Sequence, residues 1–275
     1  MRKNHTFDLF KYLSLLFVSF LVLFPFYTIF INAFKSNDEF GTSEPFALPK
    51  SFLNFHNFAL VFTRGNLDLA FFNIFIIIVL SLIGNILIGT MVAYALGRFN
   101  FKFKKVILSM FIIATVIPTI TTQVAIFSII KWLHLFNTLY APVVLFIGAD
   151  IVQIYIYLQF IKNIPYELDE SAMMDGASLF KIYRSIIFPL LTPATATLVI
   201  LKTIQMYNEM YIPFLYMPKT SLGVVSTALM RFSGNNQAQW NLIAAAILLI
   251  MIPTLLIYLF LQKYIFSGIT SGAVK

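Results

Sequence analysis

The chain has 275 residues, of which 60% are hydrophobic and only 11% are charged, and its mean hydropathy is +0.87. Soluble domains carry about 25% charged residues, so this composition excludes a soluble globular domain and predicts an integral membrane protein. The net charge of +8 comes from basic residues scattered among short connections, and because they form no stripe, we expect no nucleic-acid partner.

Six apolar stretches are each long enough to cross a hydrocarbon core of about 30 Å. They lie at about 12–34, 70–97, 106–130, 139–161, 188–216 and 241–262. The first stretch is too long for a signal peptide and no small-residue cleavage site follows it, so we expect a retained helix. The sequence therefore predicts an all-α membrane protein whose residues 1–275 form a single domain of six transmembrane helices.

The basic residues also predict the orientation of the helices. If the N-terminus lies inside, the inner connections carry most of the Lys and Arg residues, so both termini are expected in the cytoplasm. The outer loops are then 35–69 and 217–240, the long inner loop is 162–187 and the cytoplasmic tail is 263–275. The residue mix, rich in Phe, Ile, Lys and Asn, fits an AT-rich bacterial genome.

The inner loop 162–187 is predicted to form a short helix, a turn and a second short helix. Pro165 suits a helix start, and acidic residues follow in the first turns, where the helix dipole favours anions. Gly176 can end this helix in the left-handed conformation, and Ser178 can cap the next one. Such a helix suits a groove on a cytoplasmic partner, because it also has a compact apolar face. That face consists of Leu168, Ala172 and Met173.

The order of residues in this loop follows a known pattern. The chain has Glu170-Ser171-Ala172, then three residues, Gly176, nine residues and Ile186-Ile187-Phe188-Pro189. This order resembles the EAA loop of ABC importer permeases, which runs Glu-Ala-Ala, three residues, Gly, nine residues and Ile-x-Leu-Pro. Ser171 and Phe188 depart from the pattern, and both changes are mild.

The resemblance extends over nearly the whole chain, to the inner-membrane subunits of maltose-type carbohydrate importers. The matching segments are Phe34-Lys35-Ser36 through Glu39, Leu48-Pro49, Asn54-Phe55, Ala93 to Phe99, Leu133 to Thr138, Tyr207-Asn208-Glu209-Met210 with Pro213, and the tail Gln262 to Lys275. Tyr207 stands where the family has Trp. The tail fits the second permease of the pair.

The resemblance implies a type I ABC importer permease in a bacterial plasma (inner) membrane, a non-catalytic translocation subunit for a di- or oligosaccharide. Its partners would be a second homologous permease, a cytoplasmic ATPase dimer and an external sugar-binding protein. This chain has no Gly-x-x-x-x-Gly-Lys-Ser/Thr loop, so the ATPase would bind ATP and Mg²⁺ and this chain would hold no cofactor. ATP binding would close the ATPase and, through the loops of both permeases, turn the cavity outward.

The resemblance also assigns roles to residues of the loop and the tail. Glu170 would pair with a basic residue of the ATPase, Ala172 would permit close approach, and Gly176 would make the turn. The full set expected to contact the ATPase is Glu167, Asp169, Glu170, Ser171, Ala172, Asp175 and Gly176 in the loop and Gly268, Gly272 and Lys275 in the tail. The outer loop 217–240 would probe the binding protein.

Charged residues inside spans are candidate functional sites because their burial in a membrane is costly. Lys202, Gln205 and Glu209 share one helix face, and with Asp150 they could form a polar pathway wall or, alternatively, a structural Asp150–Lys202 pair. The polar run 118–123 is expected to interrupt the third span near mid-membrane. It could bond sugar hydroxyls, or its threonines could bond their own helix. The candidate pathway residues are Thr121, Gln123, Asp150, Gln153, Lys202, Gln205, Asn208 and Glu209.

Three other functions compete with sugar import. An ABC permease for a glycerol phosphate ester or a polyol is possible, although a phosphate ester would favour an Arg in the pathway and no span contains one. An ion-coupled secondary transporter would leave the loop unexplained and would favour internal repeats, which the chain lacks. A membrane hydrolase or a metal site is disfavoured because the chain has no cysteine and its three histidines lie far apart outside the spans.

Overall fold

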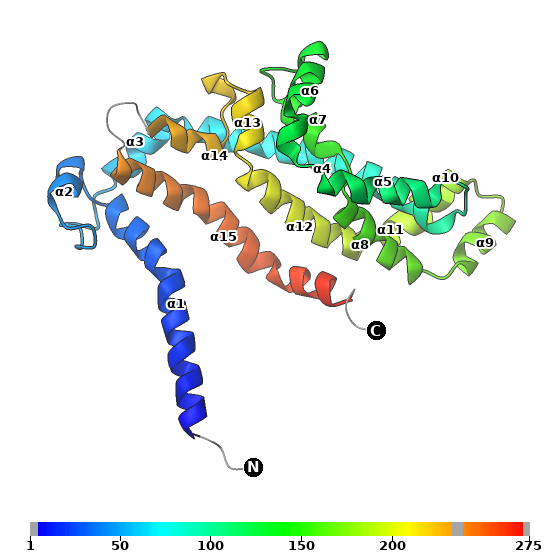
Figure 1. The fold of residues 1–275 in the computed structure, drawn as a ribbon, viewed down its shortest axis with the longest axis horizontal. Coiled ribbons are helices and arrows are strands. Elements are labelled where there is room, and N and C mark those ends of the chain that lie inside the picture. The colour runs from blue at the N-terminus through cyan, green and yellow to red at the C-terminus, as the bar shows by residue number, and fades with distance from the viewer. Residues whose placement is uncertain (1–4, 233–238, 272–275) are drawn as a thin grey trace. The chain divides into compact units, whose positions relative to one another are not determined.

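The computed structural model describes residues 5–232 and 239–271, and within them every regular element is a helix (Figure 1). Three single helices contain stretches long and apolar enough to cross a membrane. These helices are α1 (His5–Ala33), α4 (Leu67–Arg98) and α15 (Trp240–Ser271). The predicted all-α membrane architecture is confirmed.

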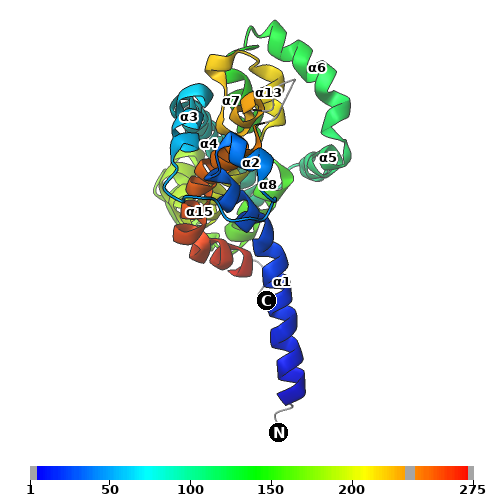
Figure 2. The same ribbon diagram turned by 90° about the vertical axis from the view of Figure 1, so that its left-hand side faces the viewer.

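Three further candidate spans are pairs of helices joined at a sharp bend. The pairs are α5 (Lys104–Val116) with α6 (Thr119–Trp132), bent by 105°, α7 (Tyr140–Ile147) with α8 (Ile151–Lys162), bent by 47°, and Leu179–Leu190 with α12 (Thr192–Asn208), bent by 71°. Figure 2 shows the bend between α5 and α6 clearly. Counting each pair as one span gives six candidate spans among the described residues, the number that the sequence predicts.

The predicted range 188–216 differs most from the structure. Helix α12 ends at Asn208, and Tyr211–Tyr216 form a separate short helix, α13. Glu209 ends α12, because its backbone is extended (φ −71°, ψ 121°). Its Oε1 also stabilises the start of α13, because it accepts hydrogen bonds from the first backbone N–H groups of that helix. The sequence could not show this cap, since both segments are apolar.

The other two breaks have different causes. Proline disfavours helical conformation in the residue before it, and Ile117 accordingly ends α5 in an extended conformation before Pro118. The interruption that the polar run 118–123 predicts is therefore confirmed. The break between α7 and α8 was not predicted. There Gly148 is extended, and Asp150 caps α8 by accepting a 2.9 Å hydrogen bond from the Gln153 backbone N–H.

The chain forms two compact units, residues 1–68 with 227–253 and residues 69–226 with 254–275. In the first unit a buried amide joins three helices. Asn57, in α3 (His56–Gly65), donates from Nδ2 to Ala33 O at 2.8 Å and to Lys35 O at 2.7 Å. Asn241 of α15 donates to Asn57 Oδ1 at 3.2 Å, so part of the predicted outer loop 35–69 is tied to the helices.

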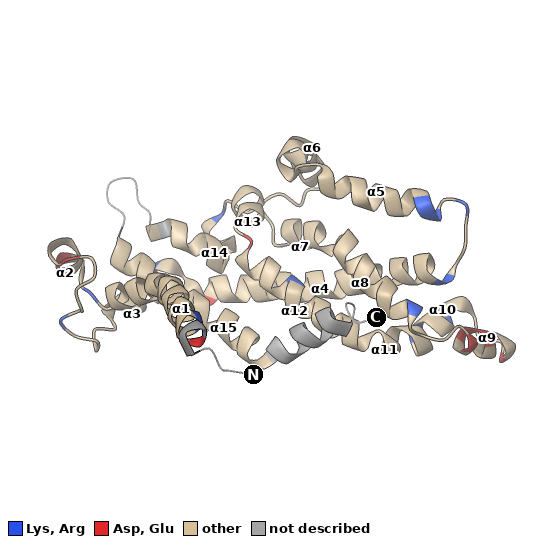
Figure 3. Ribbon diagram, turned by 60° about the horizontal axis from the view of Figure 1, so that its bottom comes forward, with Lys and Arg blue, Asp and Glu red and all other residues tan. Residues whose placement is uncertain are grey.

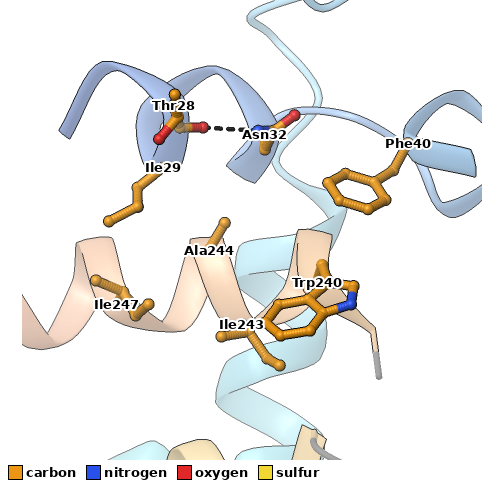
Figure 4. Close-up of a pocket in the computed structure, with 8 residues that line it drawn as sticks. All are labelled: Thr28, Ile29, Asn32, Phe40, Trp240, Ile243, Ala244 and Ile247. Atoms are coloured by element: carbon orange, nitrogen blue, oxygen red, sulfur yellow. Dashed lines mark hydrogen bonds between the residues drawn. The ribbon is translucent and has the colours of Figure 1, made fainter. Parts of the chain in front are cut away.

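A hollow of about 240 Å³ lies between α1, α15 and the short helix α2 (Asn37–Thr42) in the same unit. Figure 4 shows the ring of Phe40 and the indole of Trp240 at one end and Ile247 at the other. Asn32 is the polar neighbour on α1, and its amide already donates to Thr28 O at 2.8 Å. The lining is therefore mostly apolar.

The second unit is packed around one face of α4. A Cβ on Gly97 would lie 2.7 Å from Ile161 of α8, and a Cβ on Gly89 would overlap the Gln153 side chain. These glycines let α8 approach α4 closely, as small residues do between membrane helices.

The remaining short elements of the described chain are α9 (Glu167–Met174), α10 (Leu179–Ile182), a π-helical turn (Tyr183–Ile187), α11 (Phe188–Leu190), the 3₁₀ turns Thr220–Leu222 and Leu229–Phe232, and α14 (Val225–Ala228).

Candidate functional site

The loop 162–187 folds as the sequence predicts, as a short helix, a turn and a second short helix. Helix α9 ends in a left-handed Gly176 (φ 78°). Ala177 N–H donates to Ala172 O at 2.9 Å and Gly176 N–H donates to Met173 O at 3.0 Å, which together form a Schellman motif. The Ser178 hydroxyl then accepts a hydrogen bond from the Lys181 N–H and caps α10. The turn is therefore fixed by its own backbone.

Most of the loop residues expected to contact an ATPase are exposed. Exposed side chains are those of Glu167, Glu170, Ser171 and Asp175, and exposed apolar ones beside them are Leu168, Met173 and Met174. Figure 3 shows the acidic residues of α9 at the same end of the second compact unit as the basic residues that follow α4. Helix α9 therefore presents a mixed acidic and apolar surface. Ala172 is partly covered.

Asp169 differs from the other acidic residues because it is 2% exposed and faces its own chain. Its Oδ2 lies 3.0 Å from Arg98 Nη2, at the C-terminal end of α4. The two groups form an ion pair, although their angle is not that of a hydrogen bond. Burial raises the pKa of the Asp169 carboxyl above its ordinary value, and the charge of Arg98 opposes this shift.

Arg98 holds the beginning of the loop at several points. Its Nη2 donates to Ile164 O at 3.0 Å and to Pro165 O at 3.4 Å, and its guanidinium lies 5.6 Å from the centre of the Tyr166 ring. A planar guanidinium can satisfy a carboxylate, carbonyl oxygens and an aromatic face together, which a lysine cannot do. In the sequence, Arg98 stands out only as part of the segment Ala93 to Phe99 that resembles the family. Its place at the end of a span, next to a loop rich in acids, was the available signal.

The second half of the loop contacts the same face of α4, one and two turns earlier. The hydroxyls of Thr90 and Tyr183 lie 2.7 Å apart, and the Tyr94 ring lies 5.6 Å from the Tyr183 ring. Because Thr90, Tyr94 and Arg98 are spaced by four residues, they form one stripe on α4. Helix α9 and the π-helical turn that follows α10 are thus bound to a single transmembrane helix.

Three of the predicted pathway residues meet at a cavity of about 550 Å³ between α6, α7, α12 and α13. These are Gln123, Gln205 and Glu209. The Tyr216 hydroxyl donates to Gln123 Oε1 at 3.0 Å, and Glu209 Oε1 accepts from the Tyr211 N–H at 2.8 Å. The cavity is lined by Thr119, Ile120, Gln123, Ile126, Leu145, Phe146, Gln205, Glu209, Tyr211, Ile212 and Tyr216.

Two other predicted pathway residues bond their own helices and do not line this cavity. Thr121 Oγ1 donates to Pro118 O at 2.7 Å, as the alternative reading of the polar run predicts. Asn208 Nδ2 donates to Ile204 O at 2.9 Å. Neither side chain therefore faces the three residues that meet at the cavity.

Asp150, Gln153 and Lys202 instead surround the break between α7 and α8. Lys202 of α12 forms an ion pair with Asp150, so the structural pair considered from the sequence is present. Asn85 of α4, which carries no functional signal in the sequence, donates from Nδ2 to the carbonyl oxygens of Phe146, Ile147 and Gly148 at 3.2, 3.4 and 2.9 Å. The backbone groups freed by the break are thereby satisfied inside the protein, as a membrane requires.

Of the three tail residues, Gly268 lies near the end of α15. Gly272 and Lys275 lie outside the described residues.

Known proteins resemble the chain in sequence and in fold. Residues 85–271 match the family described as "Binding-protein-dependent transport system inner membrane component". The chain is 32% identical over 255 residues to the melibiose/raffinose/stachyose import permease protein MelC of Bacillus subtilis (strain 168), with 91% of each chain covered. It is 33% identical over 264 residues to AmyC of Thermoanaerobacterium thermosulfurigenes, a probable permease protein for starch degradation products, with 96% of this chain and 93% of the relative covered.

A solved structure has the same fold. A chain of a bacterial ABC transporter involved in the import of the acidic polysaccharide alginate superposes with a TM-score of 0.83 at 18% identity, covering 96% of this chain and 98% of that one. The family match covers more than half of the chain, and the two permeases are related over nearly its whole length. The chain therefore belongs to the family of inner-membrane components of binding-protein-dependent transport systems.

Proposed function

We propose that this chain is a translocation subunit of an ATP-driven importer for a di- or oligosaccharide. The observation that carries this proposal is the exposed surface of α9, in a loop that Arg98 and Tyr183 bind to one face of α4. A short helix with exposed Glu170, Leu168 and Met173 has the acidic and apolar surface that a groove on an ATPase would accept. The sugar assignment follows from the relatives, since MelC is a melibiose/raffinose/stachyose import permease protein and AmyC is a probable permease protein for starch degradation products.

In this proposal the chain performs no catalysis. A second homologous permease would complete the pathway, a cytoplasmic ATPase dimer would bind ATP and Mg²⁺, and a binding protein would deliver the sugar from outside. Closure of the ATPase would push α9, and the stripe of contacts on α4 would carry this movement into the membrane helices. Both termini and α9 would lie on the cytoplasmic side.

The test is a charge reversal in the exposed part of α9. We would co-express the chain with its permease partner, ATPase and binding protein, reconstitute the complex in nanodiscs and compare wild type with Glu170→Lys. The matched control is Asp38→Lys, which makes the same change of charge at an exposed position of α2. We expect Glu170→Lys, but not Asp38→Lys, to abolish co-purification of the ATPase and stimulation of ATP hydrolysis by the sugar-loaded binding protein.

Two results would contradict the proposal. Normal assembly and stimulation in Glu170→Lys would remove the coupling role of α9. Sugar uptake by this chain without any ATPase would establish a secondary transporter instead.

A further inference from the structure

We propose that the cavity between α6, α7, α12 and α13 is a binding site for part of an uncharged sugar chain. This inference rests on the proposed import function and adds the residues and the charge class of the substrate. The cavity volume of about 550 Å³ falls in the range of roughly 300–1,000 Å³ that small-molecule sites occupy. Polar groups from three helices meet in a mostly apolar lining, which is the usual composition of such sites.

Gln123 contributes hydrogen-bond donors. Its Oε1 already accepts from the Tyr216 hydroxyl at 3.0 Å, and this contact fixes the amide so that Nε2 keeps both of its hydrogens for a ligand. Gln123 follows the break at Pro118 by little more than one helical turn. The bend of span three therefore brings this amide into the cavity, where a straight helix would place it differently.

Gln205 and Glu209 contribute from the opposite wall. Gln205 lies in the last turn of α12, Glu209 is the residue that follows this helix, and both line the cavity. Glu209 Oε1 caps α13, but Oε2 has no hydrogen-bond partner within the described chain, and neither has the Gln205 amide. An amide and a carboxylate oxygen side by side can bond two neighbouring sugar hydroxyls, one as donor and one as acceptor.

The charge of the lining selects an uncharged ligand. No Lys or Arg is among the described residues that line the cavity, and Glu209 carries a negative charge that would repel an acidic sugar. Lys202 lies one turn from Gln205, but its ammonium is paired with Asp150 outside the cavity. Tyr211, half-exposed in the lining, offers an aromatic ring on which the C–H face of a sugar ring can pack.

The test measures binding of labelled sugars to the assembled importer in nanodiscs, without binding protein. The probes are raffinose and maltotriose, which are neutral, and a trisaccharide of uronic acids, which is acidic. The variants are Gln123→Leu and Gln205→Leu, which keep the approximate size and remove the hydrogen bonds. The control is Thr122→Leu, which places leucine on the neighbouring position of α6, where the Thr122 hydroxyl bonds Thr119 O and does not line the cavity.

We expect the wild-type complex to bind a neutral probe and not the acidic one. Each Gln→Leu change should weaken binding of the neutral probe by about five- to tenfold, because a sugar hydroxyl loses its hydrogen-bond partner. Thr122→Leu should leave this binding unchanged. The inference is overturned by binding of the acidic probe alone, by unchanged binding in both Gln variants, or by no binding in a complex whose ATPase still responds to the binding protein. If the ATPase of the wild-type complex did not respond to the sugar-loaded binding protein, the proposed function itself would be contradicted.

Discussion

Arg98 Nη2 lies 3.0 Å from Asp169 Oδ2, and this ion pair joins the last turn of α4 to the first turns of α9. Both side chains are nearly buried, at 8% and 3% exposure. The pair therefore differs from a surface salt bridge, which would contribute little. Its importance is positional, because the same guanidinium also bonds Ile164 O and so fixes the chain on the N-terminal side of α9.

The first prediction concerns Arg98→Ala. This change leaves the Asp169 carboxylate buried without its partner, which costs roughly 3–5 kcal/mol in comparable buried pairs. We expect α9 to detach from α4 and sugar uptake per ATP hydrolysed to fall at least severalfold. The measurement is the ratio of uptake to ATP hydrolysis in proteoliposomes, together with the rate of proteolysis within the loop 162–187.

Two variants separate position from charge. Lys102→Ala removes an exposed basic charge a few residues after α4 and should change neither quantity. Arg98→Gln combined with Asp169→Asn leaves no buried charge, so it should protect the loop from proteolysis better than Arg98→Ala does. If Arg98→Ala coupled transport as wild type does, the ion pair would have no role in positioning α9.

The second prediction concerns pH. The folded pKa of Asp169 is raised, chiefly by burial, so the folded loop holds this proton more tightly than the unfolded loop does. Ionisation of Asp169 therefore lowers the free energy of unfolding. The stability that the protonated carboxyl contributes is fully present below the ordinary carboxyl pKa of about 3.9, and it is lost as the pH rises through the folded pKa. In Asp169→Asn this part of the pH dependence should be absent.

The measurement is the rate of proteolysis within the loop between pH 4 and pH 7, with an acid-active and a neutral protease compared over the range. Asp175→Asn is the matched control, because Asp175 is exposed at the end of the same helix. The same slope in wild type and in Asp169→Asn would show that other groups cause the pH dependence.

Local signals and distant contacts explain what the sequence could and could not predict. The turn at Gly176, the cap at Ser178 and the break at Pro118 depend on neighbouring residues, and all three are present in the structure. The burial of Asp169 depends on Arg98, 71 positions away in the chain. An acidic residue in a short polar helix gives no local sign of such a partner.

The same reasoning applies to the cavity and to the break after α7. Gln123, Gln205 and Glu209 could be nominated from polarity and helix spacing, but only the tertiary fold separates them from Gln153, which is fully buried against α4. The break at Gly148 is possible because the Asn85 amide, on another helix, shares its two hydrogens among three carbonyl oxygens at the break. No pattern within residues 139–161 contains that information.

The third prediction concerns Gly89→Ala. The added methyl group would overlap the Gln153 side chain, whose Nε2 donates to Asn85 O at 3.0 Å. Moving this amide would disturb the contact of α4 with α8, so we expect a loss of about 1–3 kcal/mol in stability, as for other overpacked sites. The measurement is the unfolding midpoint of the purified complex, followed by fluorescence-detected size exclusion after heating.

Gly148→Ala is the control for this change. It adds the same methyl group in open space at a backbone angle (φ −58°) that any residue adopts. Its midpoint should equal that of wild type or exceed it slightly, because alanine restricts the unfolded chain. Equal midpoints for Gly89→Ala and Gly148→Ala would mean that the packing of Gly89 against Gln153 is loose.

The fourth prediction decides whether Lys202 and Asp150 form a structural pair or contact the substrate. Lys202→Met alone leaves an unpaired carboxylate at membrane depth, which should lower both the amount of folded protein and uptake. Asp150→Asn keeps a side chain that can cap α8, because asparagine is as good an N-cap as aspartate. The double variant Lys202→Met/Asp150→Asn should therefore recover most of the folded protein. If the pair is structural, the double variant should also recover uptake, with an unchanged KM for the sugar-loaded binding protein. Recovery of folded protein without recovery of uptake would instead assign one of the two charges to the substrate pathway, at a point outside the cavity between α6, α7, α12 and α13.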